Sequence, residues 1–476
     1  MEKIFKLSKN KTTVRTEILA GLTTFMTMSY IIALNPNLLA DYDKGSPLWN
    51  GVFLATCISS ALGTICMAFL ANKPFAMAPG MGINTFLAVV ISHIAVVNDT
   101  SYETAFQAGL SIILVEGLIF LMFSILDLRE KIVEAIPLGI RLGISPAIGL
   151  FLMDIGFGSN LRIFAEESDH DTPFYALRDF FGAFDPQYLK EKMGNVYDEM
   201  VISVVTMIIG LIVIIVLAKK KVRSAVLLGM LTASAAYWFC EGFILDQNPF
   251  ASLGNASFVP PFKDLADTTL FKFDFKGMFG LGIVSVVTLI ITFCIIDMFD
   301  TIGSLFGAAS TSGMIDNQGK MDHMKEAFVS DAIGTIAGAC TGTSTVNTYV
   351  ESASGVEAGG RTGLTALTTG IMFLACMFIA PIAAIIPSAA TSSALIYVGI
   401  LMLQELQKIN FNDLDQFVPV IIMLLAMPVT ASIGNSIGLA LIIYTLIKVF
   451  SGKGKSVSIL TYILSFIFLV KFFVLL

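Results

Sequence analysis

The sequence has 476 residues, of which 55% are hydrophobic and only 14% are charged, and its mean hydropathy is +0.81. No water-soluble globular protein needs so much apolar surface, so the composition predicts a polytopic membrane protein. The formal net charge is −7, and the basic residues form no single patch, which argues against a nucleic-acid-binding protein.

The cysteines and the common catalytic motifs argue against a metal centre and against an enzyme. All six cysteines lie in apolar stretches without a CxxC pair, so we expect buried free thiols and no disulfide framework. The sequence holds no HExxH or GxSxG pattern and no cluster of His and Cys. We therefore expect a protein that is not an enzyme and that uses no metal or other cofactor.

The N-terminal residues predict a first span that is retained. The basic residues that precede the first apolar run are Lys3, Lys6, Lys9, Lys11 and Arg15. The run is longer than the apolar region of a signal peptide, and no small-residue cleavage site follows it. We expect a multi-pass protein of the cytoplasmic membrane with a cytosolic N-terminus.

Fourteen apolar segments follow one another along the chain, several of them short or interrupted. They cover 16–36, 51–71, 75–92, 104–126, 138–157, 199–218, 224–245, 282–308, 327–340, 343–358, 363–386, 388–406, 414–428 and 432–450. Basic residues follow every even-numbered segment, as expected of cytosolic loops, whereas the acidic loop 158–198 is expected outside. A further apolar run, 456–475, contains Lys471 and is expected at the interface or on the flank.

Three short motifs recur in the same order in the two halves of the chain. The pairs are Ala61-Leu-Gly-Thr64 with Ala332-Ile-Gly-Thr335, Asn84-Thr-Phe86 with Asn347-Thr-Tyr349, and Gly117-Leu-Ile-Phe120 with Gly370-Ile-Met-Phe373. Two halves of seven segments each would begin on opposite sides of the membrane, because seven is odd. The order therefore predicts an inverted repeat.

The third segment of each half is poorly suited to a continuous helix. Pro74 directly precedes segment three, which contains Pro79, Gly80 and Gly82, and segment ten begins with 343–346, where Thr343, Thr345 and Val346 are β-branched. We expect two short extended pieces that pair with each other, each followed by a half-helix whose N-terminus offers free N–H groups. Irregular backbone of this kind is tolerated at bilayer depth only where it is buried or lines a cavity.

Acidic residues inside apolar segments are the candidate functional groups. Asp297 and Asp300 are three residues apart in segment eight, on nearly one helical face, and Glu351 lies within segment ten. A carboxylate at bilayer depth costs about 2.5–3.5 kcal/mol on insertion scales, so it marks a functional site by default. Asn84 is a candidate ligand and Asn347 a candidate helix cap, while hydrogen bonding within the structure is expected of Glu116 and Asp154.

The charge of these groups limits the ligand that they would accept. Carboxylates repel anions and attract cations or neutral molecules with several N–H donors. They accept two parallel N–H bonds from a planar edge, and a purine or a pyrimidine offers such an edge. A carboxylic acid can also carry a proton, so recognition and coupling could use the same residues.

Four stretches of the sequence carry a resemblance to a known family, namely Glu17 to Tyr30, Pro79 to Thr85, Asp297 to Gly303, and Thr341 to Gly355. Together they resemble the nucleobase–cation symporters of the nucleobase–ascorbate superfamily, in particular the AzgA-like purine permease branch. The resemblance implies an all-α fold of fourteen segments in two inverted repeats of seven. It also implies adenine, guanine or hypoxanthine as the substrate, with protons rather than sodium as the coupling ion.

The resemblance further implies a division into domains and a set of site residues. The core domain would comprise 1–126 and 275–386, the gate domain 127–246 and 387–452, and a C-terminal helix would occupy 453–476. The substrate would contact Asp300, Glu351, Asn84, Gly82 and Ser352, while Asp300 and Asp297 would carry the proton. The core would move against the gate, through which a homodimer would form. The alternatives are an anion or other small-solute transporter of the same fold, and sodium-coupled nucleobase transport.

Overall fold

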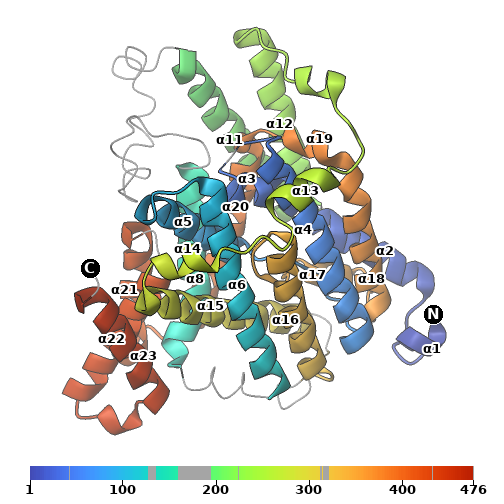
Figure 1. The fold of residues 1–476 in the computed structure, drawn as a ribbon. Helices are drawn as coiled ribbons and strands as arrows, with labels where there is room; N and C mark the ends of the chain where they lie inside the picture. Colours follow the sequence, from blue (N-terminus) through green and yellow to red (C-terminus); the bar gives the residue numbers. More distant parts are fainter. Residues whose placement is uncertain are drawn as a thin grey trace. The chain divides into compact units, whose positions relative to one another are not determined.

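The computed structural model is helical and describes residues 1–41, 43–126, 136–158, 195–222, 224–310, 314, 321–430 and 433–474 (Figure 1). The predicted acidic loop 158–198 lies, apart from its ends, outside the described residues. The chain divides into two compact units, each built from two stretches of sequence. The first unit contains Met1–Val133 and Ser257–Ala384, and the second contains Glu134–Ala256 and Ile385–Leu476.

Eight helical spans among the described residues are long and apolar enough to cross a membrane. They are Val14–Leu39, Pro47–Ala71, Tyr102–Ile125, Leu138–Phe157, Asp198–Lys219, Ala225–Ile244, Gly363–Ala384 and Ser388–Lys408. Shorter apolar helices cover Met81–Val97, Ile283–Met298, Leu414–Met427, Gly434–Phe450 and Ile459–Val470. These spans agree with a multi-pass membrane protein.

The first unit contains both broken segments that the sequence predicts. Its N-terminal stretch contains α1 (Glu2–Phe5), α2 (Val14–Met28), α3 (Ile31–Leu39), α4 (Pro47–Cys66), a π-helical turn (Met67–Ala71), β1 (Met77–Pro79), α5 (Met81–Val97) and α6 (Tyr102–Ile125). Its second stretch contains α13 (Phe262–Thr268), α14 (Phe275–Gly280), α15 (Ile283–Ser310), α16 (Met324–Thr341), β2 (Val346–Thr348), α17 (Ser352–Glu357), α18 (Gly363–Ala375), a 3₁₀ turn (Cys376–Ile379) and α19 (Ala380–Ala384).

Local sequence accounts for several of these boundaries. Ser46, Ser101 and Thr362 each accept a backbone N–H of the following first turn and so begin α4, α6 and α18. Gly342 ends α16 with φ of 112°, a conformation that L side chains rarely adopt. Helix α16 therefore stops just before the extended residues of β2.

Strands β1 and β2 pair antiparallel, which confirms the predicted contact between the two broken segments. Met77 lies opposite Thr348, Ala78 opposite Asn347, and Pro79 opposite Val346. Each strand receives a hydroxyl from the helix that precedes it in the chain. Thr64 of α4 donates to the carbonyl of Met77 (3.1 Å), and Thr335 of α16 donates to that of Val346 (3.4 Å).

Small residues let the helices of the first unit approach the strands closely. A methyl group at Gly63 would lie 3.3 Å from Cα of Gly334, and one at Gly334 would lie 3.1 Å from Cγ1 of Val346. The helices α4 and α16 therefore meet at their glycines, beside the strand pair. A methyl group at Gly117 of α6 would lie 3.1 Å from Ile336, and one at Gly370 of α18 would lie 3.1 Å from Ile65.

The second unit is a bundle of helices. It contains α8 (Leu138–Phe157), α11 (Asn195–Lys219), α12 (Ala225–Ile244), a 3₁₀ turn (Ala251–Asn255), α20 (Ser388–Leu403), a second 3₁₀ turn (Gln404–Lys408), α21 (Leu414–Thr430), α22 (Ile433–Phe450), a third 3₁₀ turn (Gly454–Ser456) and α23 (Ile459–Val474). Helix α8 meets α20 at Gly149 and Gly399, where a methyl group on either residue would lie 2.5–2.6 Å from the carbonyl oxygen of the other. Helix α23 packs on α22, where Phe468 contacts Gly438.

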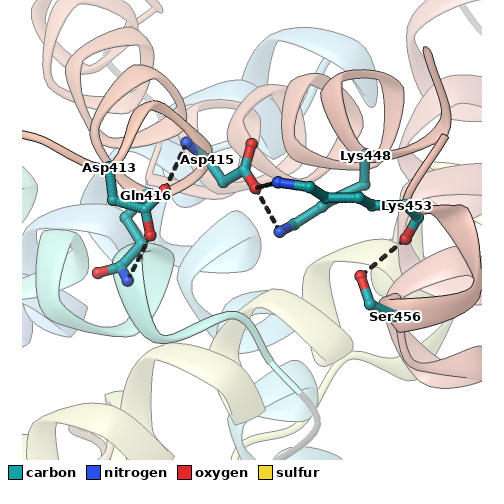
Figure 2. Close-up of polar contacts among 6 residues, drawn as sticks. All are labelled: Asp413, Asp415, Gln416, Lys448, Lys453 and Ser456. Carbon is teal, nitrogen blue, oxygen red and sulfur yellow. Dashed lines mark hydrogen bonds and ion pairs between the residues drawn. The ribbon is translucent and has the colours of Figure 1, made fainter. Parts of the chain in front are cut away.

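An ion pair joins the start of α21 to the end of α22. Nζ of Lys448 donates to Oδ2 of Asp415 (2.5 Å), and Nζ of Lys453 lies 3.6 Å from the same oxygen. Figure 2 shows these residues together with Asp413, whose carboxylate accepts from the backbone N–H of Asp415 and from the side chain of Gln416.

Candidate functional site

The strand pair and the residues that follow it position the acidic side chains of the first unit. Because successive side chains of a strand point to opposite faces, Asn347 points away from the face of Val346, which packs on α4 and α16. Two residues beyond β2 the chain reaches Val350, which is 56% exposed, and then Glu351, which is partly exposed. Glu351 therefore lies where buried strand gives way to accessible surface of this unit.

Glu351 receives a hydrogen bond from segment one. The hydroxyl of Tyr30 donates to Oε1 of Glu351 at 2.8 Å. Tyr30 is buried and lies between the end of α2 at Met28 and the start of α3 at Ile31. The break in segment one therefore places a phenol beside the carboxylate of segment ten.

Asp300 of α15 receives a hydrogen bond from the strand pair. The Nδ2 atom of Asn347 donates to Oδ2 of Asp300 at 2.6 Å. The prediction that Asn347 caps a helix is therefore wrong, because the residue lies inside β2 and its amide binds a carboxylate. Gly80 makes room for this amide, since a methyl group there would lie 2.8 Å from Nδ2 of Asn347.

Asp300 and Glu351 belong to adjacent elements, because α15, which carries Asp300, packs against β2 and against α17, which begins directly after Glu351. Among the described residues, the side-chain hydrogen bonds to these acids use one oxygen of each, Oδ2 of Asp300 and Oε1 of Glu351. Each acid therefore retains a second oxygen that can accept an N–H. Two neighbouring acceptors of this kind suit a neutral molecule that presents several N–H donors.

Asn84, Gly82 and Ser352 are placed differently from the two acids. The side chain of Asn84 donates to the carbonyl of Pro79 (3.3 Å) and accepts from the hydroxyl of Ser344. Gly82 is buried in the first turn of α5. The hydroxyl of Ser352 accepts from the backbone N–H of Ala76 (3.0 Å). The structure thus places Asp300 and Glu351 on adjacent elements, whereas Asn84 and Ser352 hydrogen-bond to residues of β1 or next to the strands.

Asp297 takes part in a buried network that also contains an acid the sequence interpretation overlooked. The hydroxyl of Thr301 lies 2.7 Å from Oδ2 of Asp331 and 3.4 Å from Oδ1 of Asp297. The other oxygen of Asp331 accepts from the backbone N–H of Thr348 (3.2 Å). This network joins α15, α16 and β2. An aspartate inside the apolar segment 327–340 was the signal that could have identified Asp331.

Two further acids of the apolar segments, Glu116 and Asp154, lie inside helices. Oε2 of Glu116 in α6 accepts from Thr345 at 3.2 Å, as expected of a group that hydrogen-bonds within the structure. Asp154 is buried in α8 of the second unit. Within the described part of the chain, no group of three or more His, Cys, Asp and Glu side chains is arranged to hold a metal ion.

Comparisons with known proteins identify the relatives of this chain. The model of the permease family matches residues 15–439. The guanine/hypoxanthine permease PbuO of Bacillus subtilis is 34% identical over 476 residues, covering 99% of this chain and 100% of that protein. The adenine permease AdeP of Escherichia coli is 33% identical over 471 residues, covering 99% of this chain and 95% of that protein.

A solved structure shows the same fold at low sequence identity. The transmembrane domain of the cyanobacterial bicarbonate transporter BicA aligns with a TM-score of 0.58 and 14% identity. The alignment covers 88% of this chain and 97% of that one.

Proposed function

Because this chain belongs to the permease family, and is therefore a membrane transporter rather than an enzyme, we propose that it carries purine nucleobases. The observation that carries this proposal is that Asp300 and Glu351 lie on adjacent elements beside the paired strands, where Asn347 binds the first acid and Tyr30 binds the second. The relatives named as guanine/hypoxanthine and adenine permeases match nearly the full chain, which supports a purine substrate.

The two acids would recognise the base through its hydrogen-bond donors. The free oxygens of Asp300 and Glu351 accept N–H groups from the edge of the purine, a geometry that carboxylates use for planar donors in general. Gly82 and Asn84 lie in the first turn of α5, and Ser352 follows Glu351 in the chain. In this proposal they complete the pocket, with free N–H groups of the first turn of α5 facing polar atoms of the base. Asp300, together with Asp297, carries the coupling proton.

The architecture that we assign to this transport is fourteen segments in two inverted repeats. The matching threonines Thr64 and Thr335 bind matching strands, and the matching glycines Gly63 and Gly334 face each other, which supports a pseudo-twofold relation in the first unit. In the second unit, Gly149 and Gly399 face each other in the same way.

In the proposed transport cycle, the two units have different roles. The first unit is the core domain that carries the substrate, and the second is the gate domain. The core moves against the gate to expose the site alternately to the two sides. The protein lies in the cytoplasmic membrane with its N-terminus in the cytosol, and it forms a homodimer through the gate domain.

An anion is the alternative cargo, since BicA shares the fold and is described as a bicarbonate transporter. Two neighbouring carboxylates argue against this cargo because they repel an anion. A screen of purines and of small anions for thermal stabilisation of the purified protein separates the two functions, since only a bound ligand raises the melting temperature.

Uptake measurements test the site directly. In cells that lack their own purine permeases, wild-type protein should accumulate labelled guanine, hypoxanthine or adenine, and Asp300→Asn and Glu351→Gln should not. The matched controls are Asp267→Asn and Glu357→Gln, which change exposed acids of α13 and α17 in the same unit. Normal accumulation by both site variants would overturn the proposed roles. Collapse of the pH gradient should abolish accumulation, whereas dependence on a sodium gradient would replace the proton by sodium.

A further inference from the structure

The helix α17, which begins directly after Glu351, is held along its length by α2 and by Tyr30, which follows α2 in the chain. At the end nearest Glu351, the hydroxyl of Tyr30 donates to the carboxylate itself (2.8 Å). In the middle, the hydroxyls of Thr27 and Ser354 are hydrogen-bonded to each other (3.0 Å). A methyl group at Gly355 would lie 2.0 Å from Oγ1 of Thr24, so the two helices are in contact there as well.

The residues that follow the far end of α17 are anchored by Glu17, the acid of α2. The buried carboxylate of Glu17 accepts from the backbone N–H groups of Arg361 (2.9 Å), Thr362 (3.2 Å) and Thr365 (3.2 Å). It also accepts from the hydroxyls of Thr362 (2.9 Å) and Thr365 (2.6 Å). Five donors leave this carboxylate fully satisfied, and they cap the start of α18 immediately after α17.

These contacts are spread along α2, on which α17 packs. Glu17 and Thr27, both in α2, are ten residues apart, which corresponds to roughly 15 Å at 1.5 Å per helical residue. A helix of six residues is too short to be stable by itself, so its position depends on the surface that it packs against.

We infer that Tyr30 is a positioning residue for substrate binding, which acts by fixing the orientation of the Glu351 carboxylate. This inference rests on the proposed function. Tyr30 donates to Oε1 of Glu351, so Oε2 is the oxygen that would accept an N–H of the substrate. The phenol is buried, and it lies at the break between α2 and α3, so its own orientation is set by packing. Loss of the hydroxyl would let the carboxylate of Glu351 rotate and would weaken its hydrogen bonds to the base.

Equilibrium binding of labelled guanine, hypoxanthine and adenine to the purified full-length protein tests the inference. A hydrogen bond to a charged group corresponds to a factor of about 10 to 150 in an equilibrium constant, and we expect purine affinity to fall by no more than this factor in Tyr30→Phe. The matched control is Thr27→Val, which removes a hydroxyl from the same pair of helices without touching the carboxylate. We expect its affinity to stay within about 3-fold of wild type, because the hydroxyl pair does not reach the substrate.

The contact itself can be checked without ligand by a double-mutant cycle. Tyr30→Phe should lower the melting temperature more in wild type than in a Glu351→Gln background, because the hydroxyl then loses a neutral acceptor instead of a charged one. If Tyr30→Phe is not recovered as a folded protein, Tyr30→His replaces it. That variant keeps an N–H donor, and we expect it to bind purine.

The outcomes separate this inference from the proposed function. Purine binding by wild type that is weakened by Tyr30→Phe but not by Thr27→Val supports both. Purine binding by wild type that is equal in the two variants overturns the role of Tyr30 alone. A wild-type protein that binds none of the three purines overturns the proposed function and this inference with it.

Discussion

The substitution Gly80→Ala should disturb the hydrogen bond between Asn347 and Asp300 while leaving both of these residues unchanged. Gly80 has φ of −67° and ψ of 124°, which any L residue adopts, so Gly80→Ala brings no backbone strain. The new carbon would lie 2.8 Å from Nδ2 and 2.9 Å from Oδ1 of Asn347. The side-chain amide, as the more flexible partner, should move away.

The size of the effect follows from the two distances. Non-bonded heavy atoms rest at roughly 3.5 Å, so the amide must shift by about 0.7 Å. A shift along the bond would stretch the 2.6 Å contact with Asp300 beyond the usual hydrogen-bond range, which ends at about 3.2 Å. A hydrogen bond to a charged group contributes about 1.5–3 kcal/mol to stability, which corresponds to a factor of about 10 to 150 in an equilibrium constant. We expect purine affinity to fall by no more than this factor.

Labelled purine uptake and binding, measured in a double-mutant cycle, provide the assay. Asn347→Ala alone should weaken binding as much as Gly80→Ala, because both remove the same donor from Asp300. The double variant should be no weaker than Asn347→Ala, since the shorter side chain removes the atoms that the methyl group would meet. The control is Gly254→Ala, whose methyl group would meet nothing within 4 Å. Additive losses in the double variant, or wild-type affinity in Gly80→Ala, would refute the reasoning.

Three further changes test the packing of each unit by thermal unfolding of the purified protein. Glu17→Gln places an N–H₂ group among five hydrogen-bond donors, and we expect it to lower the free energy of unfolding by about 2–4 kcal/mol. The control is Glu103→Gln at the exposed start of α6, which should leave that free energy almost unchanged. An unchanged melting temperature in Glu17→Gln would contradict the assigned contacts. Gly149→Ala should cost about 1–3 kcal/mol, because its methyl group would lie 2.6 Å from a carbonyl of α20; a stabilised variant would count against that close crossing. Lys448→Met should destabilise more than Lys453→Met, since Lys448 is 15% exposed and Lys453 is 63% exposed. Equal effects of the two would show that the ion pair in Figure 2 does not join α21 to α22.

The apolar stretches of the chain and the breaks in its helices could be predicted from local sequence. Hydropathy and backbone propensity are properties of neighbouring residues, so the limits of α8, α15 and α22 could be predicted closely. Proline, glycine and β-branched residues likewise predicted the extended pieces that became β1 and β2. The presence of Asp300 and Glu351 in apolar segments was visible for the same reason.

The binding partner of each polar group, by contrast, became visible from the three-dimensional fold. Tyr30 and Glu351 are 321 residues apart, and Asn347 and Asp300 are 47 apart, so no local pattern could pair them. The prediction that Asn347 caps a helix was wrong because a side-chain amide can both donate and accept, so the residue type does not identify its partner. The position of Asn347 in β2 places its amide beside Asp300. Buried polar groups must be satisfied, but the backbone that brings a donor within 3 Å is fixed by the packing of distant helices.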